Sequence, residues 1–391
     1  MRDVNNSPIL IGKYIKQPQG YKAFVPAPFP PSGGIHISAN LAKKHAEAIH
    51  LVGKLDGITK LLPDRDYFLR MFITKDASSS SQIEGTKATM MDAVEAESKD
   101  RTTNSPSDVD DILHYIRALK YGLERIGTLP ISLRFLEELH ERLMQGARTT
   151  HHAYPGEFRK SQNWIGGTRP SNARFVPPPV YEMKQSLADL EKFIYADDAY
   201  LPLIKAGLLH AQFETIHPFS DGNGRTGRML VTMYIWNTKL LEIPVLYLSS
   251  YFKKHQDFYY ERLHAYHGDP SEIEAWLEFF LEGISSTARS AIDISEKITK
   301  IREEDMRKMQ QLGKPTAATC VEVLRHLYAQ PIVSVADITA WTNYTRQGAY
   351  KVIDRLVQLN VLKPLPLKGV SKYAQKYIYW EYFNLFSEDN D

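Results

Sequence analysis

The stretch HPFSDGNGRTGR, residues 217–228, combines a histidine, a carboxylate, glycines and arginines in a pattern that suits phosphate chemistry. Pro218 disfavours helical geometry in the residue before it, so one helix is expected to end near His217. A second helix is expected to begin near Gly224, which places the glycines at a helix N-terminus. Backbone N–H groups there can converge on an anion, and Gly222 and Gly224 allow its close approach.

The charged side chains of this segment favour a triphosphate. Arg225 and Arg228 are three residues apart, so both can reach the same side of the helix. Two forked guanidiniums suit a triphosphate better than a monophosphate. Asp221 is a hard oxygen ligand that suits Mg²⁺ beside phosphates. His217 is the group that can accept a proton near neutral pH.

Three other interpretations of the segment fit less well. A capped helix with a polar turn accounts for one glycine or for His217 alone, but not for two arginines and an aspartate beside them. A Walker loop would need Gly-Lys followed by Ser or Thr after the glycines, which this segment lacks. A zinc site on one helix face would need a different spacing from that between His210 and His217.

Composition and length describe an ordinary globular protein. At 391 residues the chain is expected to form two or three domains. The net charge of +2 does not by itself require a nucleic-acid or membrane partner. One cysteine, Cys320, permits no internal disulfide, and neither a signal peptide nor a membrane-spanning apolar stretch is visible. We therefore expect a cytoplasmic protein with no membrane partner.

The elements that must position these residues are mainly helical. Residues 1–34 are rich in proline and glycine and are expected to form an extended arm. From about Ser38 onward, apolar residues recur at three- and four-residue spacing, which predicts helices. Glycines and prolines interrupt the pattern in residues 154–179, where two short extended segments predict a hairpin. Residues 286–314 end in a charged run and are expected to form a linking helix.

HPFSDGNGRTGR resembles, at every fixed position, the signature of the Fic (filamentation induced by cAMP) family, His-Pro-Phe-x-Asp-Gly-Asn-Gly-Arg-x-x-Arg. YPGEFRKSQNWIGG and RFVPPP resemble the flap hairpin of that family, and LYLSSYFKKHQDFYYERL resembles the helix after its core. The resemblance implies a mainly α fold with a helical Fic core over residues 132–285 and a short β-hairpin flap. It also implies transfer of AMP from ATP to a Ser, Thr or Tyr hydroxyl of a target protein or of the chain itself, with release of pyrophosphate.

The same resemblance assigns roles to individual residues. His217 would deprotonate the attacking hydroxyl, Asp221 would hold Mg²⁺ against the phosphates, and Arg228 would grip the γ-phosphate, while Phe219 would be an apolar anchor. The motif does not exclude another nucleotide such as UTP as the substrate. Tyr259 and Tyr260 could also be core aromatic residues with no role in binding. The residues expected to bind the nucleotide are Glu84, Ile165, Gly166, Gly167, Thr168, Asp221, Gly222, Asn223, Gly224, Arg225, Thr226, Gly227, Arg228, Tyr259, Tyr260 and His267.

The flap would also hold the target. An extended peptide can add as a strand to the bare edge of a hairpin. The resemblance places that edge at Asn163–Thr168 and Phe175–Val176, and Gly166 and Gly167 allow a close backbone approach. A plain surface hairpin is the alternative.

A second short stretch, SSSSQIEGT, lies upstream among helices. Ser81 and Glu84 fit a capping box at the start of a helix, whereas Gly85 suits the end of one. SSQIEG resembles the inhibitory motif of the Fic family, Ser/Thr-x-x-x-Glu-Gly/Asn, with Ser80, Glu84 and Gly85 in register. A Glu84 carboxylate paired with Arg228 would leave ATP bound in a pose unsuited to in-line attack. The family also implies a second role for Glu84, in removing AMP from a modified target.

Residues 315–391 are expected to form three helices followed by two strands, an order that resembles a winged helix-turn-helix domain. Lys and Arg outnumber Asp and Glu between residues 315 and 380, which favours contacts with DNA phosphates. A winged helix that contacts protein instead is the alternative. The outer face would consist of Arg346, Gln347, Tyr350 and Lys351 on the third helix and of Lys368, Lys372 and Lys376 on the wing.

These observations lead to three hypotheses for the function. The first is an adenylyltransferase whose own N-terminal region, residues 1–131, inhibits it through Glu84. The second is a bifunctional or de-AMPylating enzyme that uses Glu84. The third is a DNA-binding regulator with a nucleotide-sensing Fic core, against which the intact His217 counts. The sequence does not decide the oligomeric state, and a homodimer is compatible with each hypothesis.

Overall fold

The computed structural model describes residues 11–31, 34–35, 37–60, 62, 65–97, 107–146, 154–196, 200–269, 271–365 and 375–387. Its helices are α1 (Ala39–Thr59), α2 (Arg65–Ile83), α3 (Met90–Glu97), α4 (Asp108–Arg125), α5 (Leu133–Met144), α7 (Val180–Tyr195), α8 (Pro202–Ile216), α9 (Asn223–Asn237), α10 (Ser249–Lys254), α11 (Gln256–Ala265), α12 (Ser271–Gln310), α13 (Lys314–Ala329), α14 (Val335–Thr342), α15 (Arg346–Gln358) and α16 (Trp380–Phe383). Its strands are β1 (Gly12–Lys16), β2 (Lys22–Pro26), β3 (Ile332–Ser334), β4 (Lys363–Pro364) and β5 (Lys376–Ile378). The described chain is mainly helical, and none of its helices has the length and apolar character needed to cross a bilayer.

The segment between α8 and α9 has the geometry that its proline and glycines predict. α8 ends at Ile216, and His217 follows in the left-handed region with a φ of 48°. Gly222, with a φ of 75°, precedes the first turn of α9. The N–H and the hydroxyl of Thr226 both donate to the Gly222 carbonyl, at 3.0 and 2.9 Å, and close that turn. The predicted helix end at His217 and helix start near Gly224 are both confirmed.

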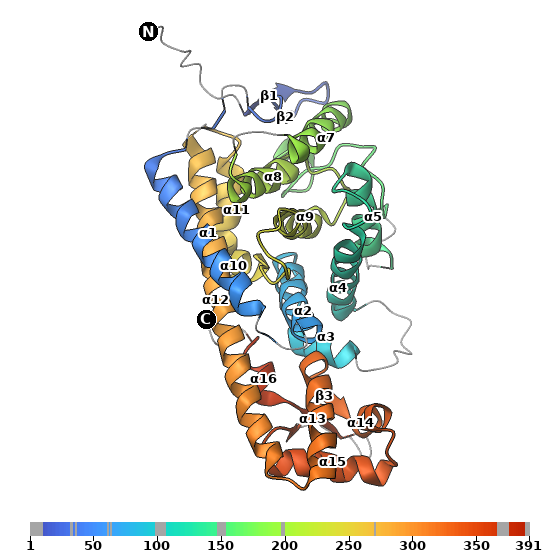
Figure 1. The fold of residues 1–391 in the computed structure, drawn as a ribbon. Helices are drawn as coiled ribbons and strands as arrows, with labels where there is room; N and C mark the ends of the chain where they lie inside the picture. Colours follow the sequence, from blue (N-terminus) through green and yellow to red (C-terminus); the bar gives the residue numbers. More distant parts are fainter. Residues whose placement is uncertain are drawn as a thin grey trace.

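α9 lies at the centre of the helical core (Figure 1). It packs against α2, α4, α5 and α8, and its side chains are buried almost all round. A helix that is apolar on every side is stable only when it is enclosed, and the run RMLVTMYIW therefore favours this position. α1 and α12 run side by side along one edge of the core, and α12 continues to the C-terminal helices.

The N-terminal region contains a hairpin where the sequence predicted only an extended arm. β1 and β2 pair in antiparallel register, with Tyr14 opposite Phe24. Phe24 is buried, and its N–H donates to the Val176 carbonyl at 2.9 Å. The hairpin therefore engages one of the two flap segments that were expected to receive a target peptide.

The predicted flap hairpin is present in a reduced form. Ile165 and Phe175 form one antiparallel bridge with N–H···O distances of 2.8 and 3.2 Å. Gly166 and Gly167 follow in the left-handed region, and an added Cβ on Gly167 would overlap the backbone of Asn172. The segment is a tight loop that depends on glycine, with a single bridge in place of two strands.

α12 belongs both to the predicted core and to the predicted linking helix. A boundary between the core and a linking helix was expected between residues 285 and 286, but α12 runs through it without a break for 40 residues. Its first half packs against α1 and α8, and its second half contacts α13 and α16. The core and the linking helix therefore share one rigid element.

The C-terminal elements, within the described part of residues 314–387, combine α13, α14 and α15 with a small antiparallel sheet of order β3–β5–β4. They pack on the N-terminal half of α2 through aromatic rings. Phe68 contacts Tyr328 at a centroid distance of 4.9 Å, and Phe72 contacts Phe386 at 5.1 Å. The helix that ends in the motif around Glu84 is thus clamped at its start by the C-terminal unit.

A buried hydrogen bond fixes this unit to α12, and it yields a prediction. The Tyr379 hydroxyl donates to Asp305 at 2.5 Å, and Lys308 lies 2.7 Å from the same carboxylate. Tyr379→Phe should lower stability by about 1–3 kcal/mol, because it leaves a buried carboxylate short of a donor. Tyr382→Phe, which removes a bond to a neutral carbonyl, is the control and should lower the melting temperature less. Equal shifts in calorimetry would contradict this assignment.

Candidate active site

One cavity of about 520 Å³ is lined by segments that lie far apart in the sequence. Its walls come from the α8–α9 loop, the end of α2, the flap and α11. The predicted site residues that line it are Glu84, Ile165, Gly166, His217, Asp221, Gly222, Asn223, Gly224, Arg228, Tyr259, Tyr260 and His267. The structure therefore brings the anion-binding loop, the candidate base and both tyrosines to one space.

Arg228 is buried at the junction of α9 and α2, with 2% of its side chain exposed. Its Nη2 donates to Glu84 Oε1 at 2.7 Å and to the Ser80 carbonyl at 2.9 Å, and its Nε donates to the Ser80 hydroxyl at 2.8 Å. A buried guanidinium is costly unless it is paired and hydrogen-bonded. The end of α2 thus neutralises Arg228 in the way that a bound anion would.

Two glycines make this contact possible. An added Cβ on Gly224 would overlap Glu84 Oε1, so the carboxylate rests directly against the backbone of α9. Gly85 has a φ of 93°, which ends α2 in the region that glycine favours. The Thr86 N–H returns to the Ser81 carbonyl at 3.2 Å. Ser81 therefore lies in the last turn of a helix, and its interpretation as the first residue of a capping box is wrong.

His217 is held through its backbone. Its carbonyl accepts from Arg159 Nε at 3.0 Å and from Asn163 Nδ2 at 3.2 Å. Its Nδ1 has no hydrogen-bond partner among the described residues. Burial, helped by the positive charge of Arg159, lowers the pKa of His217 to about 4. The imidazole is therefore neutral at pH 7 and can accept a proton.

Glu214 is an acidic neighbour of His217. Its Oε2 lies 3.7 Å from His217 Nδ1, and its Oε1 has no hydrogen-bond partner in the described part of the chain. Burial raises the pKa of Glu214 to about 8, with Arg228 opposing the rise and Glu84 adding to it. Burial thus favours the uncharged form of both groups at pH 7, so their proximity is not an ion pair. An added Cβ on Gly227 would overlap Glu214, which accounts for that glycine.

The loop before α9 is braced from α5. His140 is buried, stacks on Phe219 at a centroid distance of 3.7 Å and contacts the Asp221 carbonyl through Nε2 at 2.9 Å. Its Nδ1 accepts from the Gly156 N–H at 3.0 Å, so Nε2 carries the proton. Burial lowers the pKa of His140 to about 4, which preserves this neutral tautomer at pH 7.

Asn223 and Asp221 differ in their freedom to bind a ligand. The Asn223 side chain is buried and exchanges two hydrogen bonds of 2.8 Å with the Phe219 backbone. Asp221 keeps 42% of its side chain exposed, while its Oδ1 accepts from the Gly222 N–H at 2.6 Å. No cluster of three or more acidic, histidine or cysteine side chains in the described residues could hold a metal alone. A single exposed carboxylate fits Mg²⁺, which usually keeps water and phosphate oxygens as its other ligands.

α11 and the flap form an aromatic wall. The Tyr259 hydroxyl is 2.8 Å from His210 Nε2, and the Tyr260 ring lies 5.4 Å from that of Tyr259. His267 stacks on Phe175 of the flap with a centroid distance of 4.1 Å. Aromatic side chains of this kind suit contact with an aromatic ring of a ligand.

Some predicted residues lie outside the cavity wall: Gly167, Thr168, Arg225, Thr226, Gly227, Ser80 and Gly85. Arg225 points toward α5, where its Nη2 is 3.6 Å from Met144 Sδ. The expectation that Arg225 and Arg228 reach the same side of α9 is wrong, because the Arg228 side chain points toward α2. Glu214, His140 and Arg159 were missed. His140 and Arg159 act on Asp221 and His217, which are distant in the sequence, and the role of Glu214 depends on its burial.

Comparisons with known proteins agree with this arrangement. Residues 130–235 match the family model described as Fic/DOC family, and residues 42–124 match the one described as Fic/DOC family N-terminal. A protein adenylyltransferase Fic from Culex quinquefasciatus is 26% identical over 278 residues, which cover 67% of this chain and 50% of that protein. Another from Aedes aegypti is 32% identical over 136 residues, which cover 33% and 24%. The chain thus spans half or less of the length of these two curated relatives.

Solved structures share the fold. A Fic family protein from Desulfovibrio desulfuricans superposes with a TM-score of 0.56 at 18% identity, covering 88% of this chain and 96% of that one. A Fic domain protein from Bacteroides thetaiotaomicron gives a TM-score of 0.51 at 17% identity, covering 66% and 97%. The predicted mainly helical Fic fold is confirmed at this level.

The contacts of Arg228 predict an unequal response of two neighbouring serines. Ser80→Ala should cost about 1.5–3 kcal/mol, because the lost hydroxyl accepts from a buried charged group. Ser78→Ala is the matched control, since Ser78 is also buried on α2 but bonds only to a carbonyl of its own helix. A melting temperature that falls no further for Ser80→Ala than for Ser78→Ala would contradict the role given to Ser80.

Proposed function

We propose that the chain is a protein adenylyltransferase of the Fic/DOC family, because two segments match the models of that family and of its N-terminal domain and curated adenylyltransferases are similar to it. It transfers AMP from ATP to a Ser, Thr or Tyr hydroxyl of a target protein or of itself, and Glu84 inhibits this transfer. One observation carries the proposal. The contact between Glu84 and Arg228 lies in the same cavity as His217 and the loop before α9.

The residues of the cavity divide the chemistry among them. The first turn of α9 presents N–H groups and the positive end of the helix dipole to the phosphates. Asp221 would hold Mg²⁺, which supplies further charge stabilisation there. The aromatic wall receives the adenine. His217, neutral at pH 7, takes the proton of the attacking hydroxyl, while the preset N–H groups stabilise charge on the α-phosphate.

Inhibition follows from the pairing of Arg228. The buried guanidinium of Arg228 lines the same cavity as the loop before α9, and Glu84 and Ser80 occupy it. A nucleotide that enters this cavity lacks that partner, so its phosphates settle out of line with the attacking hydroxyl. Poor alignment alone can remove several orders of magnitude in rate.

A second reaction of the same carboxylate is favoured by its exposure. Glu84 keeps 35% of its side chain exposed within the cavity, so water can reach it. A carboxylate there can orient a water molecule toward a phosphate that links AMP to a modified protein. We include removal of AMP as the alternative activity of this site.

Glu84→Gly should raise the rate of AMP transfer, because Arg228 is then available to the γ-phosphate. Labelling of the protein itself and of lysate proteins from α-labelled ATP measures the effect, and we expect an increase of at least tenfold. Glu84→Gln keeps the length of the side chain without its charge and should give an intermediate rate.

The same variant separates the two activities of Glu84. If Glu84→Gly labels no faster than the wild type, Glu84 is not an inhibitor. If it also fails to release AMP from a premodified target that the wild type releases, the alternative activity is supported.

The lowered pKa of His217 predicts an unusual pH profile. A base with an ordinary histidine pKa near 6.5 would lose about tenfold in rate between pH 7.5 and 5.5. With a pKa of about 4, His217 stays deprotonated, and the transfer rate of Glu84→Gly should change less than twofold over that range. His217→Ala in the same background should bind ATP and show no transfer at any pH. A tenfold fall toward pH 5.5 would contradict the assignment.

We further propose that the C-terminal unit is a winged helix that binds DNA. Its three helices and antiparallel sheet support this, as do the exposed side chains of Arg346, Gln347 and Lys351 at the start of α15. Tyr350 is half-buried beside them. Of the predicted wing residues, Lys376 is 8% exposed and so does not belong to the outer face, because β5 is the central strand. Lys368 and Lys372 lie outside the described residues.

DNA binding by the full chain should weaken steeply with salt, because phosphate contacts release counterions. Arg346→Ala and Lys351→Ala should each lower the slope of log affinity against log salt by about 1. Lys43→Ala, at an exposed position of α1, is the control and should leave the slope unchanged. Absence of binding to labelled duplex at low salt would favour protein contacts for this unit instead.

A further inference from the structure

A groove of about 490 Å³ lies between the N-terminal hairpin and the flap. It is found at the end of the core where β2 contacts α7 (Figure 1). The two walls of this hairpin groove are joined by buried contacts, because the Phe24 N–H donates to the Val176 carbonyl and the Phe24 ring centroid lies 6.0 Å from that of Phe175. The residues that line the groove include Tyr14, Tyr21 and Lys22 of the hairpin and Pro170, Arg174 and Phe175 of the flap.

Cations line both walls of the hairpin groove, and the segments that form the walls contain no acidic residue. The sequence has no Asp or Glu from residue 4 to 46 or from residue 158 to 181. Lys22 and Arg174 line the groove and are exposed, and neither has an ion-pair partner among the described residues. Lys16, which is opposite Lys22 in the register of β1 and β2, is also exposed. A chain with a net charge of only +2 therefore concentrates unpaired cations here, where they attract an anionic partner.

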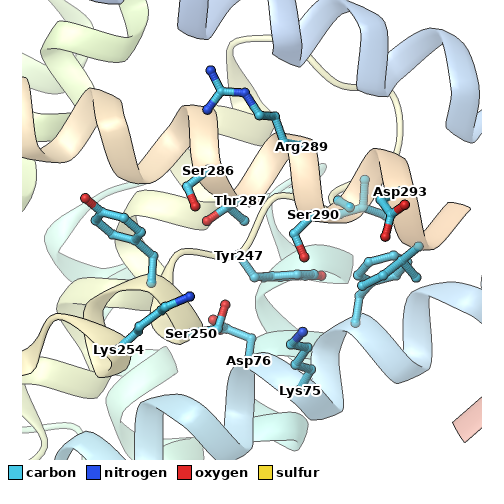
Figure 2. Close-up of a pocket in the computed structure, with 15 residues that line it drawn as sticks. Lys75, Asp76, Tyr247, Ser250, Lys254, Ser286, Thr287, Arg289, Ser290 and Asp293 are labelled. Carbon is cyan, nitrogen blue, oxygen red and sulfur yellow. The ribbon is translucent and has the colours of Figure 1, made fainter. Parts of the chain in front are cut away.

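The charged groups of another cavity, between α2, α10 and α12, are arranged differently (Figure 2). There Asp76 accepts from the Tyr115 hydroxyl at 2.8 Å and from the Ser249 N–H at 3.1 Å, and Asp293 pairs with Lys297 at 2.6 Å. The carboxylates of that cavity are thus matched by donors of the protein itself. Of these two spaces, the hairpin groove is the one in which the cations have no carboxylate on the same walls.

The hairpin groove shares a wall with the cavity that contains His217. Arg174 and Phe175 line both spaces, so a molecule held in the groove lies against the flap residues that border the reaction site. Under the function proposed above, the molecule that approaches this site beside the nucleotide is the protein whose hydroxyl is modified. The Val176 carbonyl already accepts from the Phe24 N–H, so side chains must do much of the selection of a target here.

The lining of the groove suits a polypeptide better than a nucleic acid. Lys22 and Arg174 are the two cations among the described residues that line it, whereas a nucleic-acid strand brings a negative charge with every nucleotide and needs a row of cations. Tyr14 is 47% exposed and packs edge-on against Phe24 at a centroid distance of 5.2 Å. Tyrosines that offer a free face in this way are enriched in protein interfaces. An acidic peptide supplies both carboxylates for the cations and an apolar side chain for Tyr14.

We propose that the hairpin groove docks an acidic, extended segment of the target protein. Carboxylates of the segment pair with Lys22 and Arg174, and an apolar side chain of the segment packs on Tyr14. Such docking rests on the function proposed above, and it makes acidic proteins the preferred class of target. Lys22 and Tyr14 act in the choice of target alone, because neither lines the cavity that contains His217.

Binding of a fluorescein-labelled peptide to the full chain tests the groove without any catalysis. The probe is Glu-Val-Glu-Thr-Glu-Val-Glu-Thr, and the comparison peptide carries Lys in place of each Glu. At about 0.15 M salt, fluorescence anisotropy should give an affinity for the acidic peptide roughly tenfold or more above that for the basic one, because the groove offers cations alone. Equal affinities would overturn the proposal, and so would tighter binding of a labelled single-stranded oligothymidylate than of the acidic peptide.

Two charge reversals in the same hairpin locate the site. Lys22→Glu places a carboxylate in the groove and should weaken binding of the acidic peptide by roughly tenfold. Lys13→Glu makes the same change in net charge on the opposite face of β1 from Tyr14, and it should change the affinity by less than about twofold. Both lysines are exposed and have no ion-pair partner among the described residues, so the fold should be unaffected. Equal losses in the two variants would indicate a general effect of charge and overturn the assignment to the groove.

Transfer kinetics separate this inference from the function on which it rests. In the Glu84→Gly background, Lys22→Glu should raise the KM for the acidic peptide by roughly tenfold with little change in kcat or in ATP binding. Transfer to lysate proteins by Glu84→Gly without any binding of the acidic peptide would overturn the groove and leave the proposed function intact. Binding of the peptide with no transfer by Glu84→Gly to any protein would contradict the proposed function, and with it the role of the bound segment as a substrate.

Discussion

The site depends on one buried cation. Arg228 has almost no exposed surface, and a guanidinium in that environment must be paired at all times. Its partners, Ser80 and Glu84 at the end of α2, are 148 and 144 residues upstream in the sequence. The contact that holds α2 against α9 is therefore also the contact that a nucleotide must replace. Under the proposed inhibition, stability and inhibition rest on the same atoms, which makes the inhibited arrangement the stable resting form.

The part of the site that the sequence predicted is the part determined by neighbours along the chain. Pro218 ends α8 at the residue before it, and Gly222 and Gly85 take up the left-handed geometry that other residues avoid. Such effects act over a few residues and can be read from spacing. The pairing of Glu84 with Arg228 was predicted from the family resemblance, because no local sequence pattern indicates it. His140 and Glu214 bear no such signal, because one acts through Gly156 and Asp221 and the other through burial.

The errors about the fold have similar causes. The segment before Ser38 looked extended because its composition opposes helix, yet a hairpin forms there, supported by the bond from Phe24 to Val176. The boundary predicted after residue 285 separated the core from a linking helix, whereas α12 continues from Ser271 to Gln310 across that position. Arg225 and Arg228 have the same residue type and favourable spacing, and only the positions of α5 and α2 separate them.

The length of α12 has a consequence for any molecule held at the far end of the chain. Forty helical residues span about 60 Å, and a single unbroken helix of this kind bends little. Its two halves are packed against the core and the C-terminal unit respectively, so it acts as a ruler between them. Under the function proposed above, a partner bound at α15 would be held at a constant distance from His217 and at a high effective concentration. Only targets long enough to bridge that distance would gain from the tether.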